Sequence, residues 1–161
     1  QVGEIVVKGD SVTPGYWNLP EETQKAFRDG WLQTGDLAVV NEEHYVTIVD
    51  RKKDMIITGG ENVYSTEVEN VLYMHPAVLE AAVIGVPDPK WGEAIKACVV
   101  LKPGKKTTEK ELIAFCKDYL AHYKAPKSVD FLEALPRTGS GKIFKKGLRD
   151  PHLEKTGPKG D

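Results

Sequence analysis

The strongest β-strand signals lie in the second half of the chain. Val78 to Val86 and Ala94 to Leu101 are rich in β-branched and small apolar residues, which is typical of buried strands. Val129 to Leu132 has the same character over a shorter stretch, and Met55 to Ile57 forms another run before a pair of glycines. These runs predict a β-sheet with a largely buried centre.

A helix is predicted from Thr108 onward. Thr108 with Glu111 matches the capping box that begins many helices. Apolar residues then repeat on one helical face at Leu112, Phe115, Cys116, Tyr119 and Leu120. The combination of a start signal with helical spacing predicts an amphipathic helix packed on the sheet.

A second helix is predicted between the runs at 55–57 and 78–86. Thr66 and Glu69 match another capping box, and Val68 and Leu72 belong to an apolar stripe that also contains Val71. His75-Pro76 is expected to end this helix, because proline cannot continue one.

The first part of the chain has fewer elements. Glu4 to Lys8 predicts a strand, Pro20 to Phe27 a short helix, and Leu37 to Val40 with Tyr45 to Val49 a hairpin. These elements are too few to close a core, so we expect them to complete a sheet whose other strands lie outside this sequence. A domain boundary is expected near Lys53.

Composition and charge exclude several classes of protein. Hydrophobic residues make up 40% of the 161, charged residues 29%, and no apolar run approaches the roughly 20 residues of a membrane span. The formal net charge of −2 excludes the strongly basic field of a nucleic-acid-binding protein. Cys98 and Cys116 are predicted to be core thiols in a reducing compartment, and the start of the chain lacks signal-peptide features. A cytoplasmic location is therefore expected.

A glycine-rich loop ends in Gly141-Lys142. The phosphate-binding P-loop requires glycine where Pro136 stands and Ser or Thr where Ile143 stands, so the P-loop hypothesis is rejected. A lysine on a flexible loop can nevertheless place one compact positive charge against a phosphate. The alternative is a solvated surface lysine.

Two further segments carry weaker signals. The carboxylate of Asp36, in Thr34-Gly35-Asp36, could accept both hydroxyls of a ribose, or it could belong to an ordinary turn. Gly59-Gly60 permits close approach of a ligand to the backbone, or simply forms a hairpin turn. The histidines and cysteines show no metal-ligand spacing, so no protein-held metal is predicted.

In their order and spacing, these and other segments resemble the adenylate-forming enzymes, which include acyl-CoA and aryl-CoA synthetases, luciferases and peptide-synthetase adenylation domains. The resemblance extends over nearly the whole chain. The matching segments are Gly3–Ile5, Gly15–Asn18, Trp31–Asp36, Asp50–Asp54, Gly59–Tyr64, Glu67–Glu69, Pro87-Asp88, Trp91–Glu93, Tyr123–Pro126 and Leu135–Ile143.

The resemblance implies an α+β fold in which a small C-terminal lid domain follows a β-rich piece of a large N-terminal domain. Residues 1–50 would end the large domain, 51–54 would form the hinge, 55–155 the lid, and 156–161 a flexible tail. Members of this family convert ATP and a carboxylic acid into an acyl-adenylate, and many then transfer the acyl group to CoA.

The resemblance also implies roles in the first half-reaction. Asp36 would bind the ribose hydroxyls of ATP, and Arg51 would reach the ribose or phosphate. Lys142 would be the adenylation lysine, offsetting the charge of the carboxylate substrate and the α-phosphate. Mg²⁺ would arrive on the phosphates of ATP. Asp50, where the family often has glycine, is expected to be tolerated.

For the second half-reaction, the resemblance assigns Lys53 to the hinge about which the lid rotates. Gly59, Gly60 and Glu61 would then line the passage for the pantetheine of CoA. Trp91 would stack on the CoA adenine, with Lys90 near its phosphates, or would instead pack against the core.

The predicted function is that of a C-terminal fragment of a carboxylic acid:CoA ligase. The resemblance to the family favours a fatty acid as the substrate, and the fragment alone is expected to have no activity. The expected partners are the missing N-terminal domain, the acid, ATP and CoA, without nucleic acid or a membrane span, and homo-oligomerisation stays open. The alternatives are an adenylation domain that loads a carrier protein and a non-catalytic binding module of the same fold.

Overall fold

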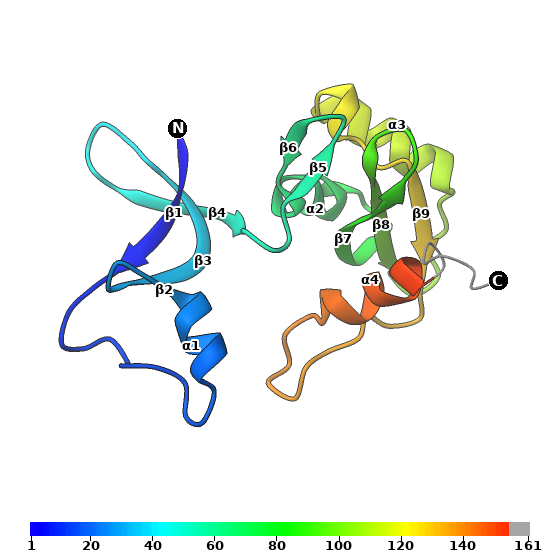
Figure 1. The fold of residues 1–161 in the computed structure, drawn as a ribbon. Coiled ribbons are helices and arrows are strands. Elements are labelled where there is room, and N and C mark those ends of the chain that lie inside the picture. Colours follow the sequence, from blue (N-terminus) through cyan, green and yellow to red (C-terminus); the bar gives the residue numbers. More distant parts are fainter. Residues whose placement is uncertain (155–161) are drawn as a thin grey trace. The chain divides into compact units, whose positions relative to one another are not determined.

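A computed structural model describes residues 1–154 of the chain and shows the predicted α+β class. The chain divides into two compact units, Gln1–Lys53 and residues 54–161, which are considered separately below (Figure 1). The division falls beside Lys53. The tail predicted at 156–161 lies outside the described residues.

The first unit is an antiparallel sheet with one short helix. Its elements are β1 (Val2–Val7), α1 (Pro20–Ala26), β2 (Phe27–Arg28), β3 (Trp31–Val40) and β4 (Val46–Arg51). The long strand β3 pairs with each of the other three strands, in register from Asp36↔Arg51 to Val40↔Val46 along β4. The predicted hairpin is therefore confirmed as β3–β4.

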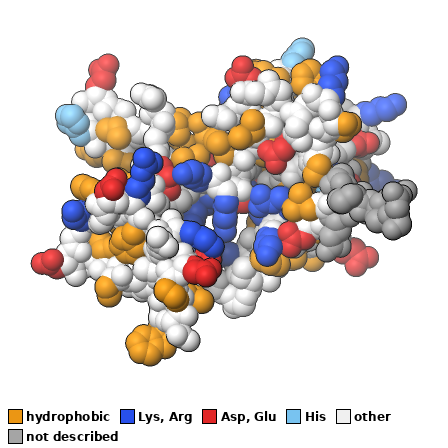
Figure 2. Space-filling model, viewed as in Figure 1, with side chains coloured by type: hydrophobic (Ala, Val, Ile, Leu, Met, Phe, Trp, Pro, Cys, Tyr) orange, Lys and Arg blue, Asp and Glu red, His pale blue; other side chains and the backbone are white. Residues whose placement is uncertain are grey.

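The core of this first unit is small. Among residues 1–53, the buried hydrophobic residues are Leu37 and Ala38. The large hydrophobic residues exposed here are Val6, Tyr16, Trp17, Leu19, Trp31, Val40, Tyr45, Val46 and Ile48, and hydrophobic side chains are visible at several places on the surface of this unit (Figure 2). A sheet that buries so little apolar surface gains little of the stabilisation on which independent folding depends.

The second unit is a five-stranded sheet with helices on both faces. Its elements are β5 (Ile56–Thr58), β6 (Glu61–Val63), α2 (Ser65–Met74), β7 (Val78–Asp88), β8 (Gly92–Leu101), α3 (Glu109–Tyr119), the short 3-10 helix η1 (His122–Lys124), β9 (Ser128–Phe131) and α4 (Lys145–Glu154). The strand order is β6-β5-β8-β7, and β9 adds to β8 as the parallel strand of an otherwise antiparallel sheet. The predicted strands at 55–57, 78–86, 94–101 and 129–132 are all confirmed.

Alternation along β7 divides the core between the two faces of the sheet. Ala81 and Val83 pack in the larger cluster, with buried residues of α2 and α3 such as Leu72 and Leu112. Ala82 and Ile84 point the other way, into a smaller cluster against which Leu148 of α4 packs. Because side chains alternate between the two faces of a strand, β7 contributes to a core on each face of the sheet. The helices cover these cores, so the second unit is built in layers (Figure 1).

Helix α4 was not predicted. Gly147 and Pro151 both disfavour a helix interior, and Pro151 lies inside α4. Packing of Leu148 on the smaller core cluster offsets this low propensity, as does the ion pair between Arg149 Nη2 and Asp54 Oδ1 at 3.3 Å. Tertiary contacts therefore stabilise a helix that local preference does not.

One predicted helix start is correct and the other is wrong. At Thr108 the capping box is complete: the backbone N–H of Glu111 donates to Thr108 Oγ1 at 3.3 Å, and that of Thr108 donates to Glu111 Oε2 at 2.7 Å. The predicted box at Thr66 does not form, because α2 begins at Ser65 without a side-chain cap. The carboxylate of Glu69 instead accepts the N–H of Val83 at 2.7 Å.

No helix within residues 1–154 combines the length and apolar character needed to cross a membrane.

Candidate functional site

The predicted nucleotide-binding residues lie side by side in the first unit. Asp36 is on β3 and Arg51 is at the end of β4, where the two residues are paired in the ladder. Arg51 Nε lies 2.9 Å from Asp36 Oδ1, and the backbone N–H of Asp36 donates to Thr34 Oγ1 at 3.1 Å. The fold therefore presents one carboxylate and one guanidinium together at the edge of a hairpin.

The carboxylate of Asp50, beside this pair, is tied to the backbone. Asp50 is only 4% exposed, and its Oδ1 accepts the N–H of Arg51 at 2.7 Å. At the position where the family that the sequence resembles often has glycine, this chain therefore has a buried side chain that is hydrogen-bonded to the backbone of the next residue. Lys53, the predicted hinge residue, is exposed and ends the first unit.

Lys142 lies on a hydrogen-bonded hairpin within the glycine-rich loop that the sequence indicated. The N–H of Gly141 donates to Thr138 O at 2.9 Å, and the N–H of Thr138 donates to Lys142 O at 2.8 Å. Gly141 has a φ of +82°, so the tip is a turn followed by a glycine bulge. A further bridge joins Arg137 to Ile143. The exposed side chain of Lys142 thus extends from an ordered backbone.

The Gly59-Gly60 pair forms a two-residue turn between β5 and β6. Both glycines have positive φ, +60° and +86°, which identifies a type I′ hairpin. The N–H of Gly59 donates to Trp91 O at 2.8 Å, and Glu93 Oε2 accepts the N–H of Ile57 at 2.7 Å. The Trp91-Gly92-Glu93 segment therefore holds the glycine turn in place.

Trp91 packs on that turn and not in the core. Its ring leaves so little room that a Cβ on Gly59 would lie 2.9 Å from Trp91 Cε3. The indole is 42% exposed and belongs to neither hydrophobic cluster, so the alternative of a core tryptophan is wrong. Lys90 Nζ lies 4.6 Å from the ring centroid, which places a cation over one face of the indole.

Gly59, Glu61 and Trp91 share a small pocket. The cavity, of about 130 Å³, is lined by Thr58, Gly59, Glu61, Trp91, Tyr123 and Lys127. Tyr123 and Lys127 were not assigned a role from the sequence, although Tyr123 lies in the segment Tyr123–Pro126, one of those that carry the resemblance to the adenylate-forming enzymes. Tyr123 and Lys127 lie near the glycine turn because of how the segment before β9 folds, and no local sequence pattern predicts this proximity.

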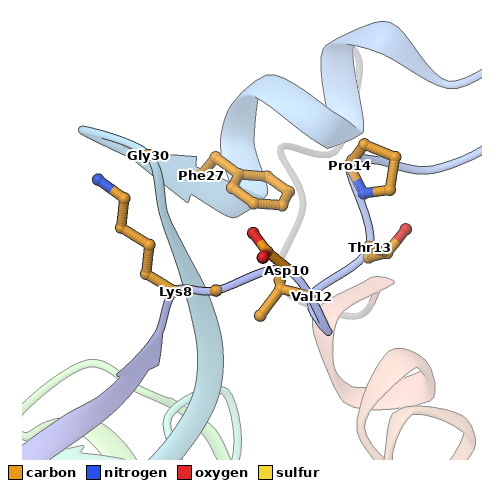
Figure 3. A pocket seen from close by; sticks show the side chains of 8 residues that line it. Lys8, Asp10, Val12, Thr13, Pro14, Phe27 and Gly30 are labelled. Atoms are coloured by element: carbon orange, nitrogen blue, oxygen red, sulfur yellow. The ribbon is translucent and has the colours of Figure 1, made fainter.

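A second pocket, of about 300 Å³, lies in the first unit. Lys8, Asp10, Val12, Thr13, Pro14, Phe27 and Gly30 are among its lining residues (Figure 3). None of the predicted site residues lines it. The predicted residues instead occupy four places: the Asp36–Arg51 pair, Lys53 at the end of the first unit, the Gly59–Glu61 turn with Trp91, and the hairpin of Lys142.

Three comparisons identify the relatives of this chain. Residues 67–142 match the family described as "AMP-binding enzyme C-terminal domain". A feruloyl-CoA synthase from an Amycolatopsis species is 55% identical over 147 residues, which are 91% of this chain and 30% of that protein. A long-chain-fatty-acid–CoA ligase from Bacillus subtilis is 52% identical over 152 residues, 94% of this chain and 27% of the ligase.

A solved structure agrees. The o-succinylbenzoate CoA synthetase from Bacillus subtilis, in complex with its acyl-adenylate intermediate, is 44% identical and superposes with a TM-score of 0.84 over 93% of this chain and 31% of the synthetase. The chain thus spans about 30% of the length of the relatives that it matches. The fold, the matched segments and these relatives together show that the chain belongs to the adenylate-forming enzymes and contains their C-terminal domain.

Proposed function

We propose that this chain is the C-terminal part of an AMP-forming carboxylic acid:CoA ligase. In this proposal, residues 1–50 end a large N-terminal domain, 51–54 form the hinge and 55–155 form a lid. The exposed apolar side chains of the first unit, among them Tyr45 and Ile48, would pack against the rest of that domain. The chain alone would then be inactive, because it lacks the upstream part of the site.

One observation carries the proposal: the charged residues with family roles are divided between two compact units. Asp36 and Arg51 lie in the unit that ends at Lys53, whereas Lys142 and the Gly59-Gly60 turn lie in the other. A lid that turns about Lys53 could bring either Lys142 or the glycine turn to a nucleotide held by Asp36. Two half-reactions at one nucleotide site require that one of these groups replace the other.

The chemistry of the first half-reaction needs a cation. A carboxylate that attacks the α-phosphate of ATP meets like charge on like charge, and the ammonium of Lys142 would offset both. In the proposal Mg²⁺ arrives on the ATP phosphates. Residues 1–154 contain no group of three or more His, Cys, Asp or Glu side chains that could hold a metal.

In the second half-reaction, the thiol of CoA attacks the acyl-adenylate and AMP leaves. The pocket beside Trp91 would take part of CoA, with the indole stacking on the adenine and Lys90 meeting a phosphate. The Gly59-Gly60 turn has no side chains that could obstruct the narrow passage of pantetheine. A fatty acid is the proposed substrate, and the compartment proposed is the cytoplasm.

The test separates the two half-reactions in the full-length protein that contains this chain. Acid-dependent ATP/pyrophosphate exchange is measured across fatty and aromatic acids, beside conversion of supplied acyl-adenylate and CoA to the thioester. We expect Lys142→Ala to reduce exchange to a small residual rate and to leave thioester formation intact. Lys146→Ala is the matched control, because Lys146 is an exposed lysine of the adjoining helix. Unchanged exchange in Lys142→Ala would refute the mechanism, and transfer to a carrier protein but not to CoA would refute the proposed acceptor.

A further inference from the structure

The hairpin that carries Lys142 is attached to the sheet through Arg137. One end of the Arg137 guanidinium, Nη1, donates to Gly141 O at 2.8 Å. The other end, Nη2, forms an ion pair with Glu80 Oε1 on β7. Because a guanidinium is a planar fork, a single side chain joins the hairpin tip to the strand.

The far side of the hairpin is fixed independently. Lys145, which begins α4, places its Nζ 2.7 Å from Glu69 Oε1 and 2.7 Å from Ser65 Oγ. These charged side chains are only 15% and 14% exposed. Lys142 therefore lies between an attachment that is partly exposed, through Arg137, and one that is less exposed, through Lys145.

The backbone position of Lys142 matters more than that of most surface lysines. Its side chain has four rotatable bonds and contributes little rigidity of its own, so the placement of its ammonium depends on the hairpin. Arg137 acts on the carbonyl of Gly141, the residue directly before Lys142. Gly141 is also the bulge residue with positive φ, where the direction of the chain is set.

We propose that Arg137 is a positioning residue for adenylation: by bridging Gly141 and Glu80 it holds the hairpin in the one orientation that presents Lys142 to the carboxylate and the α-phosphate. The inference rests on the proposed function of Lys142. Arg137 touches neither substrate and acts through Lys142. Misplacement of a reacting group by about 1 Å can cost about 100-fold in rate.

The experiment uses the full-length protein and both half-reactions. We expect Arg137→Ala to slow ATP/pyrophosphate exchange about 10- to 100-fold and to leave thioester formation from supplied acyl-adenylate within about twofold of wild type. Glu80→Gln is expected to show a smaller loss of exchange, because a neutral amide oxygen still accepts a hydrogen bond but weakens the pair. Lys117→Ala, which removes an exposed cation from α3 of the same unit, is the control.

Coupling to Lys142 separates positioning from general stability. In a Lys142→Ala background, Arg137→Ala should slow the residual exchange no further, because the group that it positions is gone. Two outcomes would overturn the role of Arg137 and leave the proposed function standing. One is an equal loss in both half-reactions of Arg137→Ala. The other is exchange by Arg137→Ala within twofold of wild type while Lys142→Ala retains only a small residual rate. If Lys142→Ala itself leaves exchange intact, the proposed function fails, and the role of Arg137 fails with it.

Discussion

Arg51 and Asp36 form an ion pair across the β3–β4 ladder, with Nε 2.9 Å from Oδ1. Their side chains are 52% and 28% exposed, so solvent screens the pair and it contributes little to stability. In the proposed function, the pair acts in ligand binding rather than in folding. The proposed ligand is the ribose and phosphate of ATP.

Replacement of Asp36 by asparagine should therefore separate binding from stability. In the full-length protein we expect the KM for ATP to rise roughly tenfold or more, because a hydrogen bond to a charged group is worth about 1.5–3 kcal/mol. The unfolding free energy should change by less than about 1 kcal/mol. Glu43→Gln, an exposed acid in the same hairpin, is the control. An unchanged KM for ATP would remove Asp36 from the nucleotide site.

The ion pair between Lys145 and Glu69, which is largely shielded from solvent, should behave in the opposite way. Lys145→Met leaves a carboxylate uncompensated at a site where both partners are about 15% exposed or less, so we expect a loss of about 3 kcal/mol in urea unfolding. The double variant Glu69→Met/Lys145→Met should recover only part of this loss, because it also leaves the N–H of Val83 without the carboxylate to which it donates. Lys146→Met, the exposed neighbour, should stay within about 0.5 kcal/mol of wild type. Equal effects of the two lysines would contradict a pair shielded from solvent.

The capping box of α3 predicts an acid-dependent loss of stability. Hydrogen bonds from the Thr108 backbone, and then from the Thr108 and Thr107 hydroxyls, hold the pKa of Glu111 below the 4.5 of the free side chain. The folded state thus binds this proton less readily than the unfolded state. The contribution is fully present above pH 4.5 and is lost as pH falls through the lower folded pKa. Glu111→Gln should flatten the pH dependence of the unfolding temperature in this window, and an unaltered acid profile would contradict the contribution.

Both cysteines should be unreactive in the folded chain. Burial raises the pKa of the Cys98 and Cys116 thiols to about 11 each, from 9.0, and neither forms a disulfide. At pH 8 we expect slow labelling by a thiol reagent in buffer and rapid labelling of both in urea. Between pH 9 and 11 the unfolded chain loses protons that the folded chain retains, so stability should fall across that window. Rapid labelling of the folded chain would show that these thiols are accessible.

The two glycines of the β5–β6 turn should respond differently to alanine. At both positions alanine incurs backbone strain, because φ is positive. At Gly59 the new Cβ would also lie 2.9 Å from the Trp91 ring, whereas at Gly60 it would meet nothing within 4 Å. We expect Gly59→Ala to slow thioester formation more than Gly60→Ala in the full-length protein, with exchange similar in both. Equal rates in the two variants would argue against a role for the Trp91 contact.

The sequence by itself determined the elements whose signals are local. The strands of the second unit follow from runs of β-branched residues, and α3 follows from the spacing of Leu112 and Cys116 behind the box at Thr108. The Gly59-Gly60 turn is equally local, because only positive φ at two successive positions closes such a hairpin. Such patterns are complete within a few residues, so they need no knowledge of distant neighbours.

Only the tertiary structure decided which partners the charged residues take. Glu69 was expected to cap α2, but its carboxylate instead accepts the N–H of Val83 and pairs with the ammonium of Lys145. Arg137 meets Glu80 because the fold returns the end of the chain to β7, and α4 forms despite Pro151 because Leu148 packs on the sheet. Such contacts join residues far apart in sequence and carry no periodic signal, since their energy exists only after the sheet has brought the two sides together.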